Sequence, residues 1–330
     1  MGRRWKSIPG LILGAVVLVG SIPLWLPIAL VLDLVRGKFR CPTARLLCFA
    51  VMWAWIEVAG VVASGLFWVA GQRRNHRIHY SLQRWWAARL MTALKLTTGL
   101  TLQVEGVDAL RPGPVMLFAR HASLADSLVS AFVTTSLARL NPRYVLKKEL
   151  LIDPCLDVVG NRLPNHFLDR EAADSAPELQ ALEELVAPLD AQGVGVIFPE
   201  GTRANPKKRE RSLQRIATTF PARAERLQHL KHLLPPRTAG AAAMLRGHPT
   251  ADVVMAWHVG FEGLDTFGGI LRAIERRVAP IRLSLRRVDR RTIPQSKVDD
   301  MEAFVQWIDS EWLRMDREVD LALSERNSGG

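Results

Sequence analysis

The sequence predicts an α/β fold, with a mostly parallel sheet and surrounding helices, preceded by two N-terminal membrane helices. Short apolar runs that are typical of strands alternate with helical stretches over most of the chain, and this alternation favours a parallel sheet. Two long apolar stretches lie before them. The net charge of +12 calls for an anionic partner, either nucleic acid or the phosphate surface of a membrane, and the apolar N-terminus favours the membrane.

The composition excludes several classes of protein. With 330 residues, of which 48% are hydrophobic and 23% charged, the chain can form one large or two ordinary domains and is neither disordered nor collagen-like. Its three cysteines, Cys41, Cys48 and Cys155, do not make a disulfide-stapled mini-protein and have no metal-ligand spacing. We therefore expect reduced cysteines, no metal and no resident cofactor.

The first apolar stretch, Ile8–Leu32, contains no charged side chain. At about 1.5 Å per residue it is long enough to cross the roughly 30 Å hydrocarbon core of a membrane. Pro9, Pro23 and Pro27 interrupt it, so the pattern fits a kinked or re-entrant helix as well as a straight span. A secretory signal is the alternative, but the apolar run is too long and lacks a small-residue cleavage site.

The second apolar stretch, Leu46–Gly71, is the cleaner candidate for a membrane helix. Trp53, Trp55 and Trp68 can anchor it at the membrane interface. Glu57 is its only charged residue and is costly in lipid, so we expect this side chain to face the other helix, a headgroup or protein.

Basic residues flank and connect the two stretches. They come before the first stretch, between the two and after the second: Arg3, Arg4 and Lys6; Arg36, Lys38, Arg40 and Arg45; and Arg73, Arg74, Arg77, Arg84 and Arg89. A hairpin with both ends in the cytoplasm agrees with the positive-inside bias, whereas the basic connection fits two helices that lie in the cytoplasmic leaflet. Both arrangements predict a cell-membrane location, contact with anionic lipids, and a cytoplasmic position for the rest of the chain.

Three regions follow from these patterns: a membrane anchor with interfacial helices at 1–94, an α/β domain at 95–296 with a basic helical insert near 205–230, and a C-terminal helix and tail at 297–330. An amphipathic helix over Trp85–Lys95 is expected at the membrane surface. The expected strands are Thr101–Glu105, Val115–Ala119, Arg143–Leu146, His166–Asp169, Val194–Phe198 and Val253–Val259, and the expected helices are Leu124–Leu137, Pro177–Ala191 and Thr238–Leu245. Ile281–Val288 alternates apolar and basic residues.

A histidine–aspartate pair in Arg120-His-Ala-Ser-Leu-Ala-Asp126 is the first candidate for chemistry. On one ideal helix the two residues would lie about 140° apart around the axis. They meet only if His121 lies in the turn after a strand and Asp126 reaches back from the next helix. A carboxylate on one ring nitrogen fixes the tautomer and leaves the other nitrogen as a general base. The alternative is a capping histidine beside a solvent-exposed aspartate.

A tight turn, Phe198-Pro-Glu-Gly-Thr-Arg203, follows a buried-looking strand. The carboxyl edge of an open α/β sheet is where ligands usually bind, and a guanidinium there suits a phosphate. A surface ion pair between Glu200 and Arg203 is the alternative interpretation.

Basic side chains also end two other expected strands. Lys147 and Lys148 end one strand, and Arg170 ends Phe167-Leu-Asp-Arg170. If these strands are neighbours in the sheet, the cations converge with Arg203 on one anion site. Taken separately, each is a charge in contact with solvent.

Together these residues resemble the glycerolipid acyltransferase family, typified by lysophosphatidic acid acyltransferase. The family's blocks read here as the His-x4-Asp motif of His121 and Asp126, then Phe167–Arg170, Phe198–Arg203 and Leu233-Leu-Pro-Pro-Arg237. The later part of the chain is more similar to the lysophospholipid acyltransferase branch of the family.

The resemblance implies a membrane-bound O-acyltransferase. Such an enzyme moves a fatty acyl group from the thioester of coenzyme A or acyl carrier protein to the free hydroxyl of a lysophospholipid. The implied acceptor is 1-acylglycerol-3-phosphate and the implied product is phosphatidic acid. His121, oriented by Asp126, is the implied base, and the thioester needs no acylated enzyme residue.

The resemblance also assigns the binding residues. Those implied for the acceptor phosphate are Arg170, Glu200, Gly201, Thr202 and Arg203, with Lys147 and Lys148 as further anion-binding residues. Leu234, Pro235 and Pro236 are expected to form an apolar wall of the acyl pocket.

Other interpretations stay open at this point. Another lysolipid or a glycolipid, such as lysophosphatidylinositol, could be the acceptor, since Arg120 and Pro235-Pro-Arg237 depart from the usual family pattern. An inactive membrane-surface scaffold and an acyl-enzyme formed on Cys155 are two further alternatives. A nucleic-acid binder explains neither the apolar N-terminus nor the turn motifs, so we expect no nucleic-acid partner.

Overall fold

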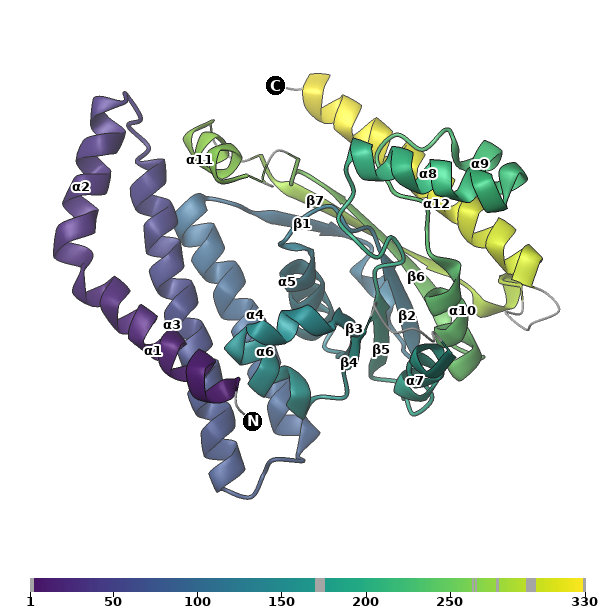
Figure 1. Ribbon diagram of the computed structural model, residues 1–330, viewed down its shortest axis with the longest axis horizontal. Helices are drawn as coiled ribbons and strands as arrows, with labels where there is room; N and C mark the ends of the chain where they lie inside the picture. Colours follow the sequence, from purple (N-terminus) through teal and green to yellow (C-terminus); the bar gives the residue numbers. More distant parts are fainter. Residues whose placement is uncertain are drawn as a thin grey trace.

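The computed structural model describes residues 3–169, 176–262, 264, 266–276, 279–294 and 301–328, and helices flank both faces of its sheet (Figure 1). Within these residues the strand order is β1-β7-β6-β2-β5-β3-β4. The strands are β1 (Leu102–Glu105), β2 (Val115–Ala119), β3 (Asn141–Lys147), β4 (His166–Leu168), β5 (Gly193–Ile197), β6 (Asp252–Val259) and β7 (Ile281–Val288). Neighbouring strands are parallel except β6 and β7. The predicted α/β class and mostly parallel sheet are confirmed.

The central strand β2 is apolar throughout because both of its faces are buried. Val115 and Leu117 pack on one face of the sheet, and Met116 and Phe118 pack on the other. Both faces of the strand are therefore covered, as is usual for a parallel sheet. The first face is covered by α4 (His76–Thr98) and α5 (Asp126–Ala131), and the second by α7 (Ala176–Val186), α10 (Thr238–Gly247) and α12 (Met301–Ser328).

The expected basic insert is helical. It forms α8 (Pro206–Thr219) and α9 (Pro221–Leu227), which lie beside α12 in Figure 1. Two further helices of this part of the chain are α6 (Pro154–Val158) and α11 (Phe267–Arg276). No residue of α8 is buried, in agreement with an exposed insert.

The N-terminal helices depart from the expected pair of membrane helices. Of the described helices, only α3 (Pro42–Val69) is by itself long and apolar enough to cross a membrane. The first stretch forms α1 (Arg4–Gly20) and α2 (Ile22–Val35), which meet the same criterion only together and are bent by 64°. A second straight membrane helix is thus not among the described helices, because the chain breaks at Gly20-Ser21 ahead of the proline at the start of α2. The bend agrees with the kinked or re-entrant form that was the alternative for this stretch.

The expected amphipathic helix at Trp85–Lys95 is part of the longer helix α4. Ala87 and Ala93 are fully buried, whereas Trp85 is exposed. The helix α4 lies between α3 and the sheet (Figure 1). The indole nitrogen of Trp86 donates a hydrogen bond of 2.9 Å to Glu57 of α3. Glu57 therefore faces protein, one of the environments expected for it.

Candidate active site

The structure brings His121 and Asp126 together at the carboxyl edge of the sheet. His121 lies in the turn after β2, and Asp126 is the first residue of α5. The Nδ1 atom of His121 lies 2.9 Å from Oδ2 of Asp126. The same oxygen accepts hydrogen bonds from the backbone N–H groups of Ala122, at 2.7 Å, and Ser123, at 2.8 Å. The carboxylate thus reaches back over the turn, which is the geometry that lets residues five positions apart meet.

Asp126 is held in its ionised form. Burial alone would raise the pKa of this carboxyl, but hydrogen bonds from His121 and the Ser123 amide, together with the adjacent His258, hold it well below its usual value. An ionised partner fixes the His121 tautomer with a proton on Nδ1 and leaves Nε2 as the basic nitrogen. The ring keeps 17% of its side-chain surface exposed, so Nε2 remains accessible to a substrate.

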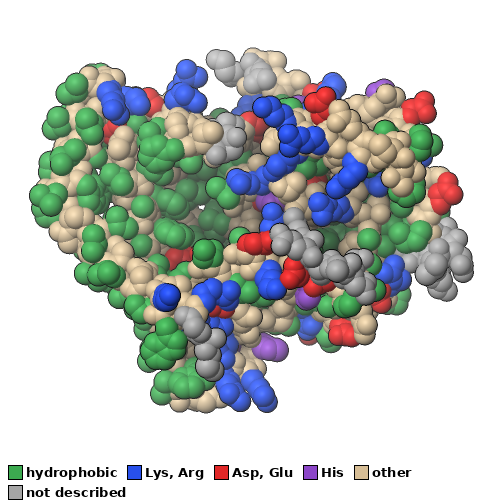
Figure 2. All heavy atoms as spheres, viewed as in Figure 1, with side chains coloured by type: hydrophobic (Ala, Val, Ile, Leu, Met, Phe, Trp, Pro, Cys, Tyr) green, Lys and Arg blue, Asp and Glu red, His purple; other side chains and the backbone are tan. Residues whose placement is uncertain are grey.

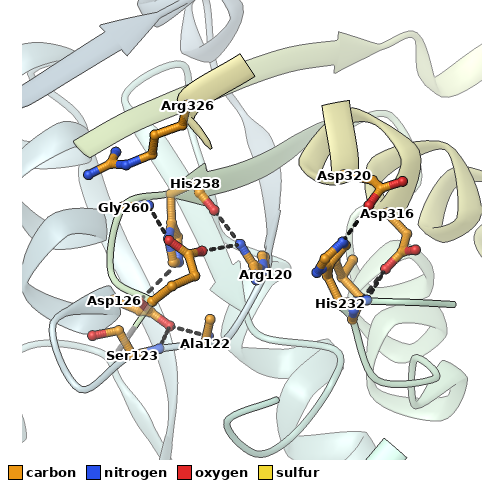
Figure 3. A network of polar contacts seen from close by, with 12 residues as sticks. Arg120, Ala122, Ser123, Asp126, His232, His258, Gly260, Asp316, Asp320 and Arg326 are labelled. Atoms are coloured by element: carbon orange, nitrogen blue, oxygen red, sulfur yellow. Dashed lines mark hydrogen bonds and ion pairs between the residues drawn. The ribbon is translucent and has the colours of Figure 1, made fainter. Parts of the chain in front are cut away.

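A second histidine, His258, lies on the other side of the same carboxylate. Its Nε2 atom is 3.0 Å from Oδ1 of Asp126, and its side chain is buried. Figure 3 shows the surrounding contacts: Arg120 donates to the backbone carbonyl of His258, and its guanidinium lies 3.5 Å from Glu262. Sequence reasoning missed this residue. The available signal was a histidine near the end of an apolar strand, since β6 pairs with β2 and the two strand ends meet.

Glu200 occupies a different place from the one predicted. Its side chain is buried behind the turn and does not itself line the catalytic cavity. One carboxyl oxygen accepts from the backbone N–H of His121, at 2.8 Å, and the other from that of Leu234, at 2.9 Å. Burial raises the pKa of Glu200 to about 8. The expectation of direct phosphate binding is therefore corrected: Glu200 ties the histidine turn to the Leu234 segment.

The turn around Gly201 presents two arginines. Gly201 has a φ of +70°, and a Cβ there would lie 3.0 Å from the guanidinium nitrogen Nε of Arg237. Glycine therefore allows both the left-handed turn and the close passage of Arg237. Arg203 and Arg237 line the same cavity as His121. Thr202 is turned toward α8, where its hydroxyl accepts from Lys208 at 3.0 Å.

The remaining predicted cations are distributed unevenly. Lys147, at the end of β3, lines the cavity with His121 and Arg203. Lys148 is exposed and forms an ion pair with Asp169 at 2.8 Å. Asp169 lines the cavity, but Lys148 itself does not. Arg170 lies outside the described residues.

Two cavities meet beside His121. The first has a volume of about 440 Å³ and is the one that holds His121, Arg203 and Arg237. The second, of about 220 Å³, is lined mainly by apolar residues and extends between α4 and α6 to Gly60 of α3. Both cavities share Leu124, Ser127, Leu146 and Leu150. In the view of Figure 2, apolar side chains cover α1–α3, and a hollow lies between these helices and the sheet.

The apolar wall of these cavities differs from the predicted one. Leu234, Pro235 and Pro236 are buried and line neither cavity. Leucines of β3, β4, α7 and the segments that follow β2 and β3 form the wall of the first cavity instead: Leu124, Leu146, Leu150, Leu168, Leu179 and Leu182. These side chains meet only through sheet pairing and helix packing.

Cys155 is not placed to be the nucleophile. It is buried in the wall of the second cavity, and burial raises the pKa of its thiol, which disfavours the reactive thiolate. Within the described part of the chain, no group of three or more histidine, cysteine, aspartate or glutamate residues could hold a metal ion.

The fold and site together define a candidate enzyme of the general-base type: a carboxylate-bound histidine beside two arginines at the ligand-binding edge of an α/β sheet. A family model described as Acyltransferase matches residues 101–256. Both site arginines, the histidine and the aspartate lie within this range. Residues 101–256 are thus identified as an Acyltransferase domain, which agrees with the resemblance that the sequence motifs predicted.

The fold is similar to that of a solved enzyme, the 1-acyl-sn-glycerophosphate (LPA) acyltransferase PlsC from Thermotoga maritima. The TM-score is 0.53 and the sequence identity is 16%, over 85% of this chain and 97% of that chain. No curated protein sequence matches the chain.

Proposed function

We propose that the chain is a membrane-bound O-acyltransferase that moves a fatty acyl group from an acyl thioester to the free hydroxyl of 1-acylglycerol-3-phosphate, forming phosphatidic acid. The observation that carries this proposal is the position of His121. Its ring is held by Asp126 at 2.9 Å and lies in one cavity with Arg203 and Arg237. A base and two cations in one cavity suit a hydroxyl and a phosphate on the same small molecule.

The reaction follows from the protonation state of the pair. Nε2 of His121 accepts the proton of the acceptor hydroxyl while the hydroxyl oxygen attacks the thioester carbonyl. The carbon–sulfur bond then breaks, and the imidazolium returns the proton to the leaving thiolate. Asp126 stays ionised and stabilises the imidazolium that forms between the two steps. The thioester is already activated, so no enzyme residue becomes acylated and no resident cofactor or metal is required.

The two arginines and the second cavity account for substrate binding. A guanidinium can pair two phosphate oxygens at once, so we assign Arg203 and Arg237 to the acceptor phosphate, with Lys147 as a further cation in the lining of the same cavity. The second cavity is apolar and continuous with the first through Leu124 and Leu146. We assign it to the acyl chain of the donor, coenzyme A or acyl carrier protein being the thiol.

The proposal places the protein at the cell membrane. The helix α3 is long and apolar enough to cross a membrane, and both acceptor and product are lipids. The active site is proposed on the cytoplasmic side, where acyl thioesters are made and where the basic flanks of the N-terminal helices favour retention.

The proposal is tested with the purified full-length protein in mixed micelles. Labelled acyl-coenzyme A or acyl carrier protein is supplied with a panel of lysophospholipids, and products are identified by mass. Phosphatidic acid is the expected main product. Acylation of lysophosphatidylinositol or a glycolipid instead would reassign the acceptor, and transfer to none of the panel would favour an inactive scaffold.

A further inference from the structure

A separate polar cavity lies at the edge of the sheet opposite to the one that carries His121. It has a volume of about 590 Å³ and is lined by residues at the starts of β3, β5 and α4 and at the end of α7. His121, by contrast, follows the end of a strand. The five residues of β5 alone separate the two edges by about 17 Å. This cavity is therefore distinct from the catalytic one.

Three arginines line this separate polar cavity: Arg77, Arg84 and Arg143. Asp190 contributes a carboxylate to its wall. Arg84 donates through Nε to the carbonyl of Thr135, and Arg143 donates through Nη1 to that of Leu185, each at 2.8 Å. These bonds hold two half-buried guanidiniums in place, and the guanidinium of Arg143 also lies beside the hydroxyl of Tyr80. Among the residues that the structure describes, none of the three arginines forms an ion pair with a carboxylate within 4 Å.

A smaller cavity of about 320 Å³ continues this basic surface. It is lined by Arg73, Arg74 and Arg162 and shares His76 with the larger one. Burial and the neighbouring Arg4 and Arg73 lower the pKa of Arg162. We call the two cavities together the basic groove. A groove of unpaired guanidiniums is a binding site for a phosphate-bearing anion.

The position of the basic groove indicates where that anion comes from. The groove begins four residues after α3 ends, and the last turns of α3 expose Leu66, Trp68 and Val69 to solvent. Exposed apolar side chains and a tryptophan beside arginines are typical of a membrane interface. In Figure 2, Lys and Arg side chains lie beside the lower end of α3, next to apolar ones. If α3 is in the membrane, the groove faces the headgroups.

We infer that the basic groove binds the phosphate of an acidic phospholipid headgroup, at a site separate from the catalytic cavity. This inference does not depend on the proposed acyl transfer. Bound headgroups would fix the height and tilt of the α/β domain relative to the bilayer. The attraction between one basic residue and an anionic membrane surface corresponds to about a fivefold change in affinity.

The test uses the full-length protein in a neutral detergent and follows its thermal unfolding midpoint. Dihexanoyl phosphatidylglycerol, dihexanoyl phosphatidylcholine and inorganic phosphate are titrated in separate series. We expect phosphatidylglycerol alone to raise the midpoint, since a ligand that binds the folded state stabilises it. Arg77→Gln should weaken the apparent affinity about fivefold, and the double variant Arg77→Gln/Arg84→Gln about 25-fold. The side chain of Arg77 is exposed and has no hydrogen-bond or ion-pair partner among the described residues, so we expect its replacement to leave the fold intact.

The matched control is Arg314→Gln/Arg317→Gln, which removes the same charge from α12 on the other side of the molecule. The control should respond to phosphatidylglycerol as the parent does, and acyl transfer from monomeric substrates should be unchanged in all variants. An equal loss of affinity in the control would show a general effect of net charge and would overturn the proposal that the basic groove is a specific binding site. A response to phosphatidylglycerol that survives in the double variant would also overturn it. Equal stabilisation by inorganic phosphate would assign the groove to free phosphate instead of lipid.

Discussion

The Oδ1 atom of Asp126 lies 3.0 Å from Nε2 of His258, while Oδ2 of the same carboxylate binds His121. The carboxylate is thus held from two sides, and the histidine on the far side is buried away from substrate. We regard His258 as a positioning residue for the proposed base. Its contact with Oδ1 fixes the orientation of the carboxylate whose other oxygen, Oδ2, binds His121.

Replacing His258 should slow turnover without weakening substrate binding. His258→Ala leaves Oδ1 of Asp126 buried and without its partner, and a hydrogen bond to a charged group is worth about 1.5–3 kcal/mol. We expect kcat to fall by one to two decades while KM for either substrate stays nearly constant. His258→Gln, which retains a donor, should recover part of the loss. An unchanged kcat in both variants would remove His258 from the account.

Arg203→Lys should separate acceptor binding from the chemical step. The charge is kept, but a lysine offers one point charge where the guanidinium offers two parallel donors. We expect KM for the lysophospholipid to rise by about one to two decades, with KM for the acyl thioester much less affected. Steady-state kinetics in mixed micelles, varying each substrate separately, measures this. A loss confined to the thioester would assign Arg203 to the donor.

Gly60 controls the depth of the apolar cavity. A Cβ at this position would lie 2.9 Å from the sulfur of Cys155, so a larger side chain must intrude on the cavity. Gly60→Leu should lower the rate with long-chain acyl donors more than with short-chain donors. Gly65→Leu on the same helix is the matched control, because a Cβ there meets no atom within 4 Å. Equal rates across chain lengths in both variants would place the acyl chain elsewhere.

Glu200 should make the folded state less stable as the pH rises. Burial raises the pKa of Glu200 to about 8 in the folded protein, from an ordinary value near 4.5. Between these values the folded state binds more protons than the unfolded state, so the free energy of unfolding falls with increasing pH. The contribution is complete below about pH 4.5 and is lost as the pH passes about 8.

Glu200→Gln isolates this contribution, because an amide does not titrate. The thermal midpoint is followed from pH 5 to pH 8.5 in the parent and the variant. We expect a smaller decline in the variant, together with a lower midpoint at pH 5. The amide has one accepting oxygen where the carboxyl has two, so one of the hydrogen bonds from His121 and Leu234 is lost. Parallel pH curves for the two proteins would show that Glu200 does not titrate in this range.

Much of the fold could be predicted because its signals are local. Each expected strand, from Thr101–Glu105 to Val253–Val259, overlaps a strand of the sheet, since runs of apolar residues between turns report burial on both faces. The contact of His121 with Asp126 was also a local expectation, because it needs only a strand, a turn and the first residue of a helix.

The remainder depends on packing between distant segments. His258 joins the site through the pairing of β2 with β6, and the environment of Glu200 is set by Leu234, 34 residues further along the chain. An isolated glutamate in a turn carries no sign of burial. The bend between α1 and α2 agrees with the kinked alternative that the prolines of this stretch allowed, but its position at Gly20-Ser21 does not follow from the apolar pattern.

The central claim is that His121 is the base that activates the acceptor hydroxyl, and His121→Ala tests it most directly. Purified parent and variant are compared for acylation of 1-acylglycerol-3-phosphate by acyl-coenzyme A, with thermal unfolding as a check that both are folded. The parent should form phosphatidic acid, and the variant should be slower by about 10²–10⁴, the usual contribution of a positioned base. A folded variant that retains more than half of the parental turnover would contradict the account.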